Sequence, residues 1–220
     1  MTIPSITVLM PVYNAARYLP QALESIISQT YRDFELLVIN DGSTDDSERI
    51  LASCDDARLR VVKTSNRGVS ASLRLGMRLA NGHYVARMDA DDVALPNRLE
   101  VQKNLLDSNP EITVAHSLVD RIDAEGRIVE PRYGELRNDV ETKWTLLWQN
   151  AVFHPTVMLR ADDLKRSRIN YRKETRIAQD FELWNRVAMV GSFYMINDVL
   201  LQYRLHDEKV SRPENAARQL

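Results

Sequence analysis

The sequence predicts an α/β protein whose first half is a largely parallel sheet. Strand-like and helix-like segments alternate over residues 6–88, a pattern typical of a sheet with crossover helices. Two of the predicted strands end in acidic residues, at Asp41 and at Asp89. Ligands of open α/β sheets bind at the carboxyl ends of the strands, so topology alone puts both acids on the ligand side.

The first half is expected to follow the order β-α-β-α-β-α-β. Its strands are short apolar runs over residues 6–10, 34–39, 59–62 and 84–88. The first of them is expected to end at Pro11, and Asn14 to cap the helix that follows. A second helix is expected to start near Thr44, because Asp45 and its acidic neighbours favour the positive end of a helix. A third covers residues 69–80.

The second half has a less regular pattern. Helices are expected over residues 99–106, 140–147 and 180–190, and strands over 112–119, 128–129, 156–159 and 199–203. The last helix has the clearest apolar stripe, with Phe181, Trp184 and Val187 facing inward. Neither a repeat nor a linker interrupts the chain, so a single domain over 1–220 is expected, with a loose tail at 213–220.

Composition excludes several classes of protein. Of the 220 residues, 44% are hydrophobic and 27% are charged, as in an ordinary globular protein. The net charge of −2 gives no electrostatic case for a nucleic-acid partner. The single cysteine, Cys54, excludes an internal disulfide framework and a cysteine-based zinc cage. The start lacks the pattern of a secretory signal, and no apolar stretch is long enough for a membrane span, so a cytoplasmic protein is expected.

The segment Asp89-Ala90-Asp91-Asp92 is the strongest candidate site. It follows the apolar run at residues 84–88, so the carboxylates should lie where a buried strand gives way to a loop. Asp89 and Asp91 are two positions apart and can face one hard divalent cation if the loop bends. The alternative for an isolated motif of this kind is a solvated acidic turn or a helix N-cap.

Seven short motifs occur in the order seen in family 2 glycosyltransferases. They are Pro11-Val12-Tyr13-Asn14, Asn40-Asp41-Gly42-Ser43-Thr44-Asp45, Asn66-Arg67-Gly68, Asp89-Ala90-Asp91-Asp92, His154-Pro155-Thr156, Gln179-Asp180 and Tyr203-Arg204-Leu205-His206. The chain resembles that family from Ile6 to about Ser211. The resemblance implies a GT-A fold, with a Rossmann-like, mostly parallel sheet flanked by helices and a smaller mixed half. Residues 1–95 would then bind the nucleotide sugar, and residues 96–212 the acceptor.

The resemblance also implies roles for individual residues. Those expected to contact the donor are Pro11, Val12, Tyr13, Asn14, Asp41, Asn66, Arg67, Asp89, Ala90 and Arg204. Asp41 would accept a hydrogen bond from the base, with the N-cap of the next helix as its alternative. Asp89 would hold donor hydroxyls, Asp91 and His206 would ligate Mn²⁺ or Mg²⁺, and Asp92 would support them.

Asp180 is the candidate general base. In similar inverting enzymes a carboxylate at this position takes the proton of the acceptor hydroxyl as its oxygen attacks the anomeric carbon. The family often has Glu-Asp where this chain has Gln179-Asp180. A helix N-cap is the alternative role of Asp180.

His154-Pro155 could shape the acceptor side or form a rigid turn. The tryptophans could stack on sugars, with core packing the favoured interpretation for each; they are Trp144, Trp148 and Trp184.

The expected function is inverting, metal-dependent transfer of a hexose from a nucleoside diphosphate sugar, with UDP as the favoured nucleotide. The acceptor would be a saccharide or a lipid-linked saccharide, as in polysaccharide biosynthesis, and peripheral membrane association is compatible with that. Two alternatives stay open. The segment Ser72-Leu73-Arg74 departs from the family pattern, which leaves open a binding module without transfer activity. The run from Asp89 to Val93 also fits the nucleophile motif of a Mg²⁺-dependent phosphatase.

Overall fold

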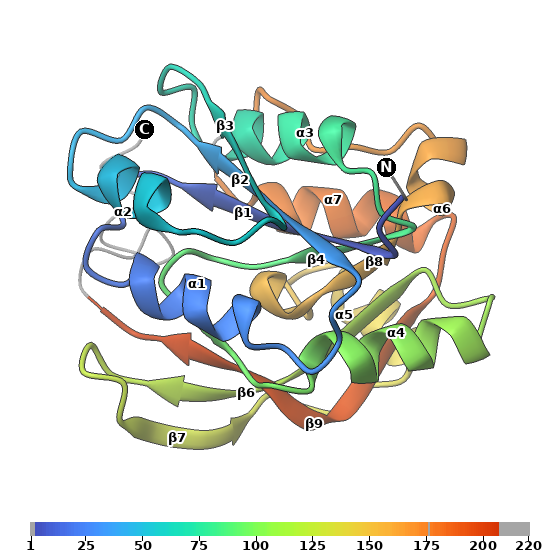
Figure 1. Ribbon diagram of the computed structural model, residues 1–220. Helices are drawn as coiled ribbons and strands as arrows, with labels where there is room; N and C mark the ends of the chain where they lie inside the picture. Colours follow the sequence, from blue (N-terminus) through green and yellow to red (C-terminus); the bar gives the residue numbers. More distant parts are fainter. Residues whose placement is uncertain (1–2, 176, 207–220) are drawn as a thin grey trace.

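The computed structural model describes residues 3–175 and 177–206. The strands join one mixed sheet, in the order β3-β2-β1-β4-β8-β6-β9-β5, with β7 paired to β6. The strands are β1 (Ile6–Val12), β2 (Phe34–Asn40), β3 (Leu59–Lys63), β4 (Tyr84–Arg87), β5 (Val93–Ala94), β6 (Val114–Ile122), β7 (Ile128–Tyr133), β8 (Met158–Arg160) and β9 (Phe193–Arg204). Figure 1 shows helices on both faces of this sheet.

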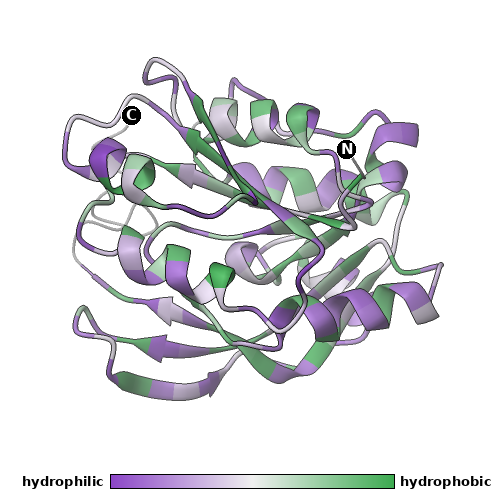
Figure 2. Cartoon of the chain, in the orientation of Figure 1, coloured by the Kyte–Doolittle hydropathy of each residue, from purple (hydrophilic) through white to green (hydrophobic). Residues whose placement is uncertain are grey.

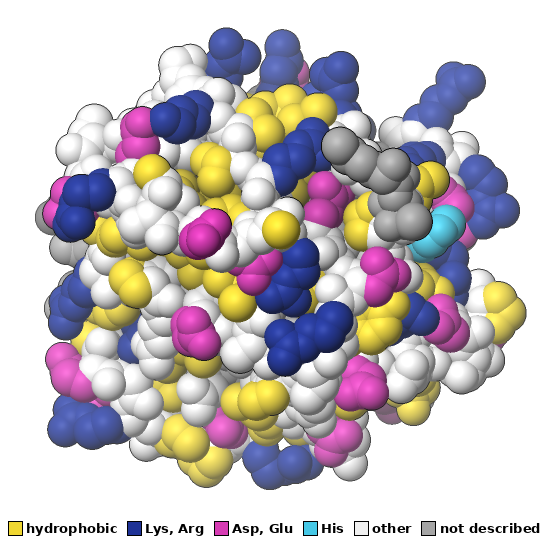
Figure 3. Space-filling model, viewed as in Figure 1, with side chains coloured by type: hydrophobic (Ala, Val, Ile, Leu, Met, Phe, Trp, Pro, Cys, Tyr) yellow, Lys and Arg dark blue, Asp and Glu magenta, His cyan; other side chains and the backbone are white. Residues whose placement is uncertain are grey.

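The helices are mostly short. They are α1 (Leu19–Ile27), α2 (Ser47–Ser53), α3 (Val69–Leu79), α4 (Arg98–Ser108), α5 (Asp139–Thr145), α6 (Ala161–Arg166) and α7 (Gln179–Ala188), with the 3₁₀ turn η1 (His154–Thr156). Within the described residues, none combines the length and apolarity that crossing a bilayer would take. Basic side chains lie among acidic ones over the face drawn in Figure 3, without a continuous field of one sign.

The parallel half of the sheet confirms the predicted alternation. β1 pairs in parallel with both β2 and β4, and β2 pairs in parallel with β3. β1 runs one residue beyond Pro11 and ends at Val12, so the predicted end of this strand was too early. The carboxyl ends of β1, β2 and β4 therefore lie along one edge of the sheet, where α/β proteins bind ligands.

The starts of α1 and α2 differ from the prediction. Asn14 does not cap α1, which begins at Leu19 after Tyr18. Asn14 instead has a φ of 49°, and its side-chain oxygen accepts a hydrogen bond from the backbone of Thr44 at 2.8 Å. That contact keeps residue 44 outside α2, which begins at Ser47. Asparagine tolerates this left-handed backbone conformation because its short polar side chain bonds locally.

Two hydrophobic clusters fill the faces of the sheet. One cluster joins β1 to α1 and α4, and the other joins it to α3 and α7. Figure 2 shows hydrophobic residues along the central strands of the sheet. Gly76 of α3 lies directly over β1, since a Cβ there would come within 2.1 Å of Leu9. Helix α3 thus packs closely on the strand that leads into the ligand edge.

The second half of the sheet is mixed, as expected. β8 runs antiparallel to β4 and β6, whereas β6 and β9 are parallel. β9 is twelve residues long, far longer than the predicted strand over 199–203, and its end pairs with the short strand β5. The predicted strand over 156–159 is replaced by η1 and β8. The expected loose tail, 213–220, lies outside the described residues.

The pairing of β9 with β5 positions the site. Residue 202 pairs with Val93, which directly follows the acidic segment. The end of β9 therefore reaches the acidic turn from the far part of the chain. No local sequence pattern reveals this pairing, because β5 is only two residues long.

Candidate active site

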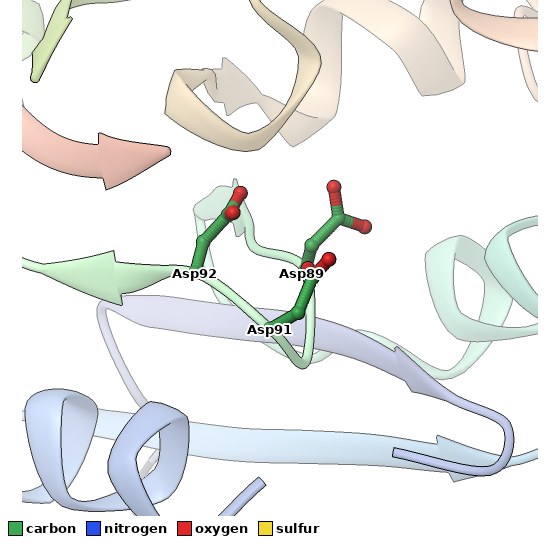
Figure 4. A group of neighbouring side chains, drawn as sticks. All are labelled: Asp89, Asp91 and Asp92. Atoms are coloured by element: carbon green, nitrogen blue, oxygen red, sulfur yellow. The ribbon is translucent and has the colours of Figure 1, made fainter. Parts of the chain in front are cut away.

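Three carboxylates rise from the turn that joins β4 to β5. Asp89, Asp91 and Asp92 each offer an oxygen, and these oxygens all lie within 4.8 Å of one another. Figure 4 shows the three side chains extending to the same side of the turn. Their surroundings differ, since Asp92 is fully buried while Asp89 and Asp91 are half-buried. The environment of each acid therefore suggests a separate role.

Asp91 contacts the other residue that the sequence predicted as a metal ligand. Its Oδ2 atom lies 2.8 Å from Nε2 of His206. The imidazole ring also packs against Tyr18, with ring centroids 5.0 Å apart. A carboxylate oxygen and an imidazole nitrogen at this separation can both reach one cation with ligand distances of about 2.1 Å. The donor set suits Mn²⁺, which accepts oxygen and nitrogen ligands.

Asp92 and Arg204 hold the acidic turn to the end of β9. The Oδ1 atom of Asp92 accepts the backbone N–H of Arg204 at 2.9 Å. In return, the Arg204 guanidinium donates to the carbonyl of Asp91 at 2.8 Å. Its remaining donors reach the carbonyls of Asp123 and Ala124 and the side chain of Gln21.

This arrangement changes the interpretation of Arg204. The residue is 1% exposed, and its guanidinium joins three separate segments of backbone and side chain. A direct contact with donor phosphates is therefore not supported by the geometry. Arg204 instead orients the turn that carries Asp91, which is also the supporting role expected of Asp92.

Asp89 is held by an arginine that the sequence analysis missed. Both carboxylate oxygens accept hydrogen bonds from the guanidinium of Arg87, one of them at 2.6 Å. Burial lowers the pKa of Arg87, but the charge and hydrogen bonds of Asp89 and the other nearby negative groups together outweigh it, and the net shift is upward. Arg87 is the last residue of a buried strand, where a charged residue interrupts an apolar run. A charged residue in a buried apolar strand needs a partner of opposite charge. The arginine in this strand was therefore the sequence signal for a neighbouring acid.

Asp41 organises the loop between β3 and α3. Its carboxylate accepts hydrogen bonds from the Thr64 hydroxyl at 2.8 Å and from the backbone of Arg67 and Gly68 at 3.0 and 2.8 Å. It therefore does not cap α2, whose N-cap is Asp46, so that alternative was wrong. Gly42 permits the approach of this loop, because a Cβ at that position would lie 2.8 Å from the Asn66 nitrogen.

The other predicted donor residues surround Asp41. Tyr13 is 49% exposed at the end of β1, whereas the Val12 side chain is in the core and offers only its backbone. The Val12 carbonyl accepts the N–H of Asp41 at 2.8 Å. Asn66 and Arg67 are exposed on the adjoining loop. Pro11, Asn14 and Ala90 complete the predicted set, on β1, the loop after it and the acidic turn.

Asp180 lies in the first turn of α7 and not at its N-cap, which is Ala178. The N-cap alternative for Asp180 was therefore wrong. Its Oδ2 atom accepts a hydrogen bond of 2.6 Å from the side-chain amide of Asn150. Asn150 is fixed in turn, because its own Oδ1 accepts the backbone N–H of Val152 at 3.1 Å. The carboxylate is thus aimed by a residue on a different segment.

A buried histidine–tyrosine pair packs beside α7, where the His154 ring contacts Trp184. His154 Nε2 lies 2.7 Å from the Tyr171 hydroxyl. Burial, then the charge of Arg87, lowers the pKa of His154 well below its usual value, so its ring is neutral. Burial raises the pKa of Tyr171; the charge of Arg87 opposes this shift, and the charges of Asp180 and Asp89 add to it. Tyr171 is therefore within the electrostatic reach of both Asp89 and Asp180, and its hydroxyl stays protonated.

The tryptophans divide into two groups. Trp184 is fully buried beside His154, with ring centroids 5.8 Å apart. Trp144 and Trp148 are exposed, so the expectation of core packing was correct only for Trp184.

The segment Ser72-Leu73-Arg74, which departs from the family pattern, contributes to the packing of α3. Leu73 is in the core, and the Arg74 guanidinium donates a hydrogen bond to the Tyr171 carbonyl at 3.2 Å.

Comparison with known proteins identifies relatives of this chain. The model of glycosyl transferase family 2 matches residues 7–168. An uncharacterized glycosyltransferase of Haemophilus influenzae is 32% identical over 96% of this chain and 69% of its own length. One from Methanocaldococcus jannaschii is 32% identical over 95% of this chain and 74% of its own. The chondroitin synthase of Escherichia coli is 25% identical over 95% of this chain but only 30% of its own length.

Solved structures share the fold. TarS of S. aureus in complex with UDP-GlcNAc has a TM-score of 0.78 and 20% identity, covering 93% of this chain and 60% of its own. The mannosyltransferase PcManGT of Pyrobaculum calidifontis, in complex with GDP-Man and Mn²⁺, has a TM-score of 0.69 and 20% identity, with coverage of 94% and 59%. The chain spans about three fifths of the length of these structures. The expected GT-A arrangement is confirmed by this similarity.

Proposed function

The chain belongs to glycosyltransferase family 2, and we propose that it transfers a hexose from a nucleoside diphosphate sugar to an acceptor hydroxyl with inversion. One observation carries the proposal. Asp91 and His206, 115 residues apart in the chain, are in direct contact at 2.8 Å. Both were expected from their motifs to ligate one cation, and a separate strand, β9, is needed to bring them together.

Asp91 and His206 would hold Mn²⁺ or Mg²⁺. Asp92 is fully buried and Asp89 is held by Arg87, whereas Asp91 is half-buried and directly contacts the second predicted ligand, so Asp91 is the member of the turn best suited to a ligand. The bound cation would supply positive charge to offset the charge that develops on the leaving nucleoside diphosphate. Asp92 and Arg204 would keep the turn in place through the hydrogen bonds between them.

The donor would lie along the carboxyl ends of β1, β2 and β4. The exposed ring of Tyr13 would cover one face of the base, and Asp41 would orient the loop that carries Asn66 and Arg67. Asp89, fixed by Arg87, would present its carboxylate edge to hydroxyls of the donor. UDP is the nucleotide we favour, and it is the nucleotide bound in the TarS complexes.

Asp180 would act as the general base. Asn150 orients its carboxylate, and a base aimed from the opposite side of the anomeric carbon to the leaving group gives inversion. The acceptor would be a saccharide or a lipid-linked saccharide. Polysaccharide biosynthesis is compatible with the similarity to chondroitin synthase.

The phosphatase alternative has lost its support. It needs Asp89 as a nucleophile, whereas both oxygens of Asp89 are bonded to Arg87, and the family match is to a transferase. A binding module would bind the same donor without transferring the sugar. It would differ from our proposal in that Asp180 takes no proton from an acceptor hydroxyl.

A nucleotide-sugar screen tests the proposal. Thermal unfolding would be followed with UDP- and GDP-sugars, in Mn²⁺ and in EDTA, because a ligand of the native state raises its stability. A UDP-sugar should raise the midpoint only with the metal, and the nucleoside diphosphate should be released when saccharides are added. Stabilisation equal in EDTA would contradict the metal role. Metal-dependent binding without release over a broad acceptor panel would favour the binding module.

A further inference from the structure

A stripe of exposed apolar side chains extends along α5 and the turn after it. Val140, Trp144, Leu147 and Trp148 are 75%, 64%, 63% and 59% exposed. Their spacing places them on one face of a helix that continues into the turn. The two indole rings meet at 88° with centroids 4.9 Å apart. Single exposed apolar residues are common, but a contiguous group of this size marks a binding surface.

The segment that carries the stripe is anchored at both ends. Leu146 and Val152 are 1% and 3% exposed and belong to the core cluster that contains Trp184 of α7. The residues between them are exposed or half-buried. Trp148 is therefore presented to solvent by a short segment whose ends are fixed, so a ligand would meet it without ordering a loop first.

Trp148 is close in sequence to the residue that aims the proposed base. Asn150, whose amide donates to Asp180 at 2.6 Å, is only two residues further along the chain. Two residues span about 7 Å at most, so the backbone of Trp148 is within that distance of the residue that aims the base. The exposed stripe and the residue that aims the proposed base therefore belong to one short stretch of chain.

The chemistry of this surface selects a sugar over a lipid bilayer. One face of a pyranose is a sheet of C–H groups that packs on an aromatic ring, and the indole N–H can donate to a hydroxyl. Exposed Gln149 and Asn150 add amide groups at the rim. An anionic bilayer would attract a basic cluster instead. The charges of α5 are two acids and Lys143, which is paired with Asp139 at 2.8 Å.

We propose that Trp148, braced by Trp144, is the stacking platform for a ring of a saccharide acceptor whose hydroxyl faces Asp180. This inference rests on the proposed transfer function and names its acceptor class. The platform binds and orients the acceptor, and Asp180 takes the proton of the attacking hydroxyl.

Ligand-observed NMR titration would test the platform. The probes are methyl glycosides of glucose, galactose, mannose and N-acetylglucosamine, added with UDP and Mn²⁺. At least one should bind the wild type, and Trp148→Ala should weaken it about tenfold or more, which corresponds to about 1.4 kcal/mol. Trp148→Phe keeps an aromatic face and should recover most of the affinity. Met189→Ala is the matched control, 84% exposed at the other end of α7.

The outcomes separate this inference from the proposed function. If UDP with Mn²⁺ fails to stabilise the wild type, the proposed function itself fails. If UDP binds all variants alike but no glycoside binds, or Trp148→Ala binds glycosides as the wild type does, the platform alone is overturned. The same holds if Trp148→Ala abolishes sedimentation with phosphatidylglycerol vesicles, or self-association, and leaves glycoside affinity unchanged.

Discussion

The imidazole of His206 lies 2.8 Å from the carboxylate of Asp91, although 115 residues separate them. The contact depends on β9, which runs beside β6 for most of its length and then reaches the acidic turn through β5. The two side chains that would share a cation are therefore supplied by the two halves of the chain. Metal binding should consequently couple the acidic turn to the end of β9.

Asp91→Ala should abolish Mn²⁺-dependent binding of UDP, because the cation loses its charged ligand. His206→Ala should weaken that binding by about 10- to 100-fold, since Asp91 and the diphosphate oxygens would still coordinate. Calorimetric titration of UDP with and without Mn²⁺ measures both effects. Asp162→Asn, an exposed acid on α6, is the control and should bind as the wild type does. Equal UDP affinity in Asp91→Ala and the wild type would refute the ligand assignment.

The Arg87–Asp89 pair should show an asymmetric response to mutation. The arginine side chain is 4% exposed and the aspartate side chain 25% exposed. Asp89→Ala leaves a buried charge without its partner and should cost about 3–5 kcal/mol. Arg87→Met leaves the more exposed partner, which water can reach, and should cost about 1–3 kcal/mol.

A double-mutant cycle measured by urea unfolding checks this asymmetry. The double variant Arg87→Met/Asp89→Ala should be less destabilised than the sum of the single variants, because neither charge is left alone. Additive effects would mean that the two groups do not interact energetically.

Asp180→Asn should lower transfer by about 10²–10⁴-fold, the usual contribution of a general base. UDP binding with Mn²⁺ should be unchanged, since the hydrogen-bond partner of this carboxylate among the described residues is Asn150, which is outside the proposed donor region. Single-turnover release of UDP from the UDP-sugar identified in the screen measures the rate. Glu182→Gln is a control on the same helix, where the carboxylate is paired with Arg186 at 2.7 Å. A variant Asp180→Asn that kept most of its rate would show that another group is the base.

The parallel half could be predicted because its information is local. Each strand from β1 to β4 is a short apolar run followed by punctuating residues, and β1, β2 and β4 are buried on both faces while the edge strand β3 is half-buried. The acids at Asp41 and Asp89 then follow from the topology of a parallel sheet. The errors there were local too. Asn14 was expected to cap a helix, and a cap was the alternative role of Asp41, but each bonds a neighbouring loop instead.

The rest of the site depends on contacts between distant segments. The partners of Asp180, Asp89 and Asp41 could not be assigned because a hydrogen-bond partner has no periodic signature in the sequence. Arg204 was expected to meet phosphate, and only the three-dimensional structure reveals that backbone carbonyls and Gln21 use its guanidinium. Trp148 was expected in the core like the other tryptophans, and only the structure reveals that it is exposed while Leu146 on the same segment is buried.

His116 should make the stability of the protein depend on pH. The residue is fully buried on β6, and among the described residues neither ring nitrogen has a hydrogen-bond partner. Burial, then the charge of Arg137, lowers its pKa to about 4, from 6.5 in an unfolded chain. Between these values the unfolded state binds the proton and the folded state does not. The free energy of unfolding is therefore highest, as far as this group is concerned, above pH 6.5, and it falls as the pH is lowered toward 4.

Replacing this histidine should remove its share of the pH dependence. From pH 6.5 to pH 5 the wild type should lose roughly 2 kcal/mol more than His116→Leu, at about 1.36 kcal/mol per pH unit. Urea unfolding of both proteins at several pH values measures the difference, and carboxylates common to both cancel in it. At pH 7.5 the variant should be as stable as the wild type or more so, since no hydrogen bond to a described residue is lost. Parallel pH profiles would show that the imidazole is protonated or hydrated in the folded state.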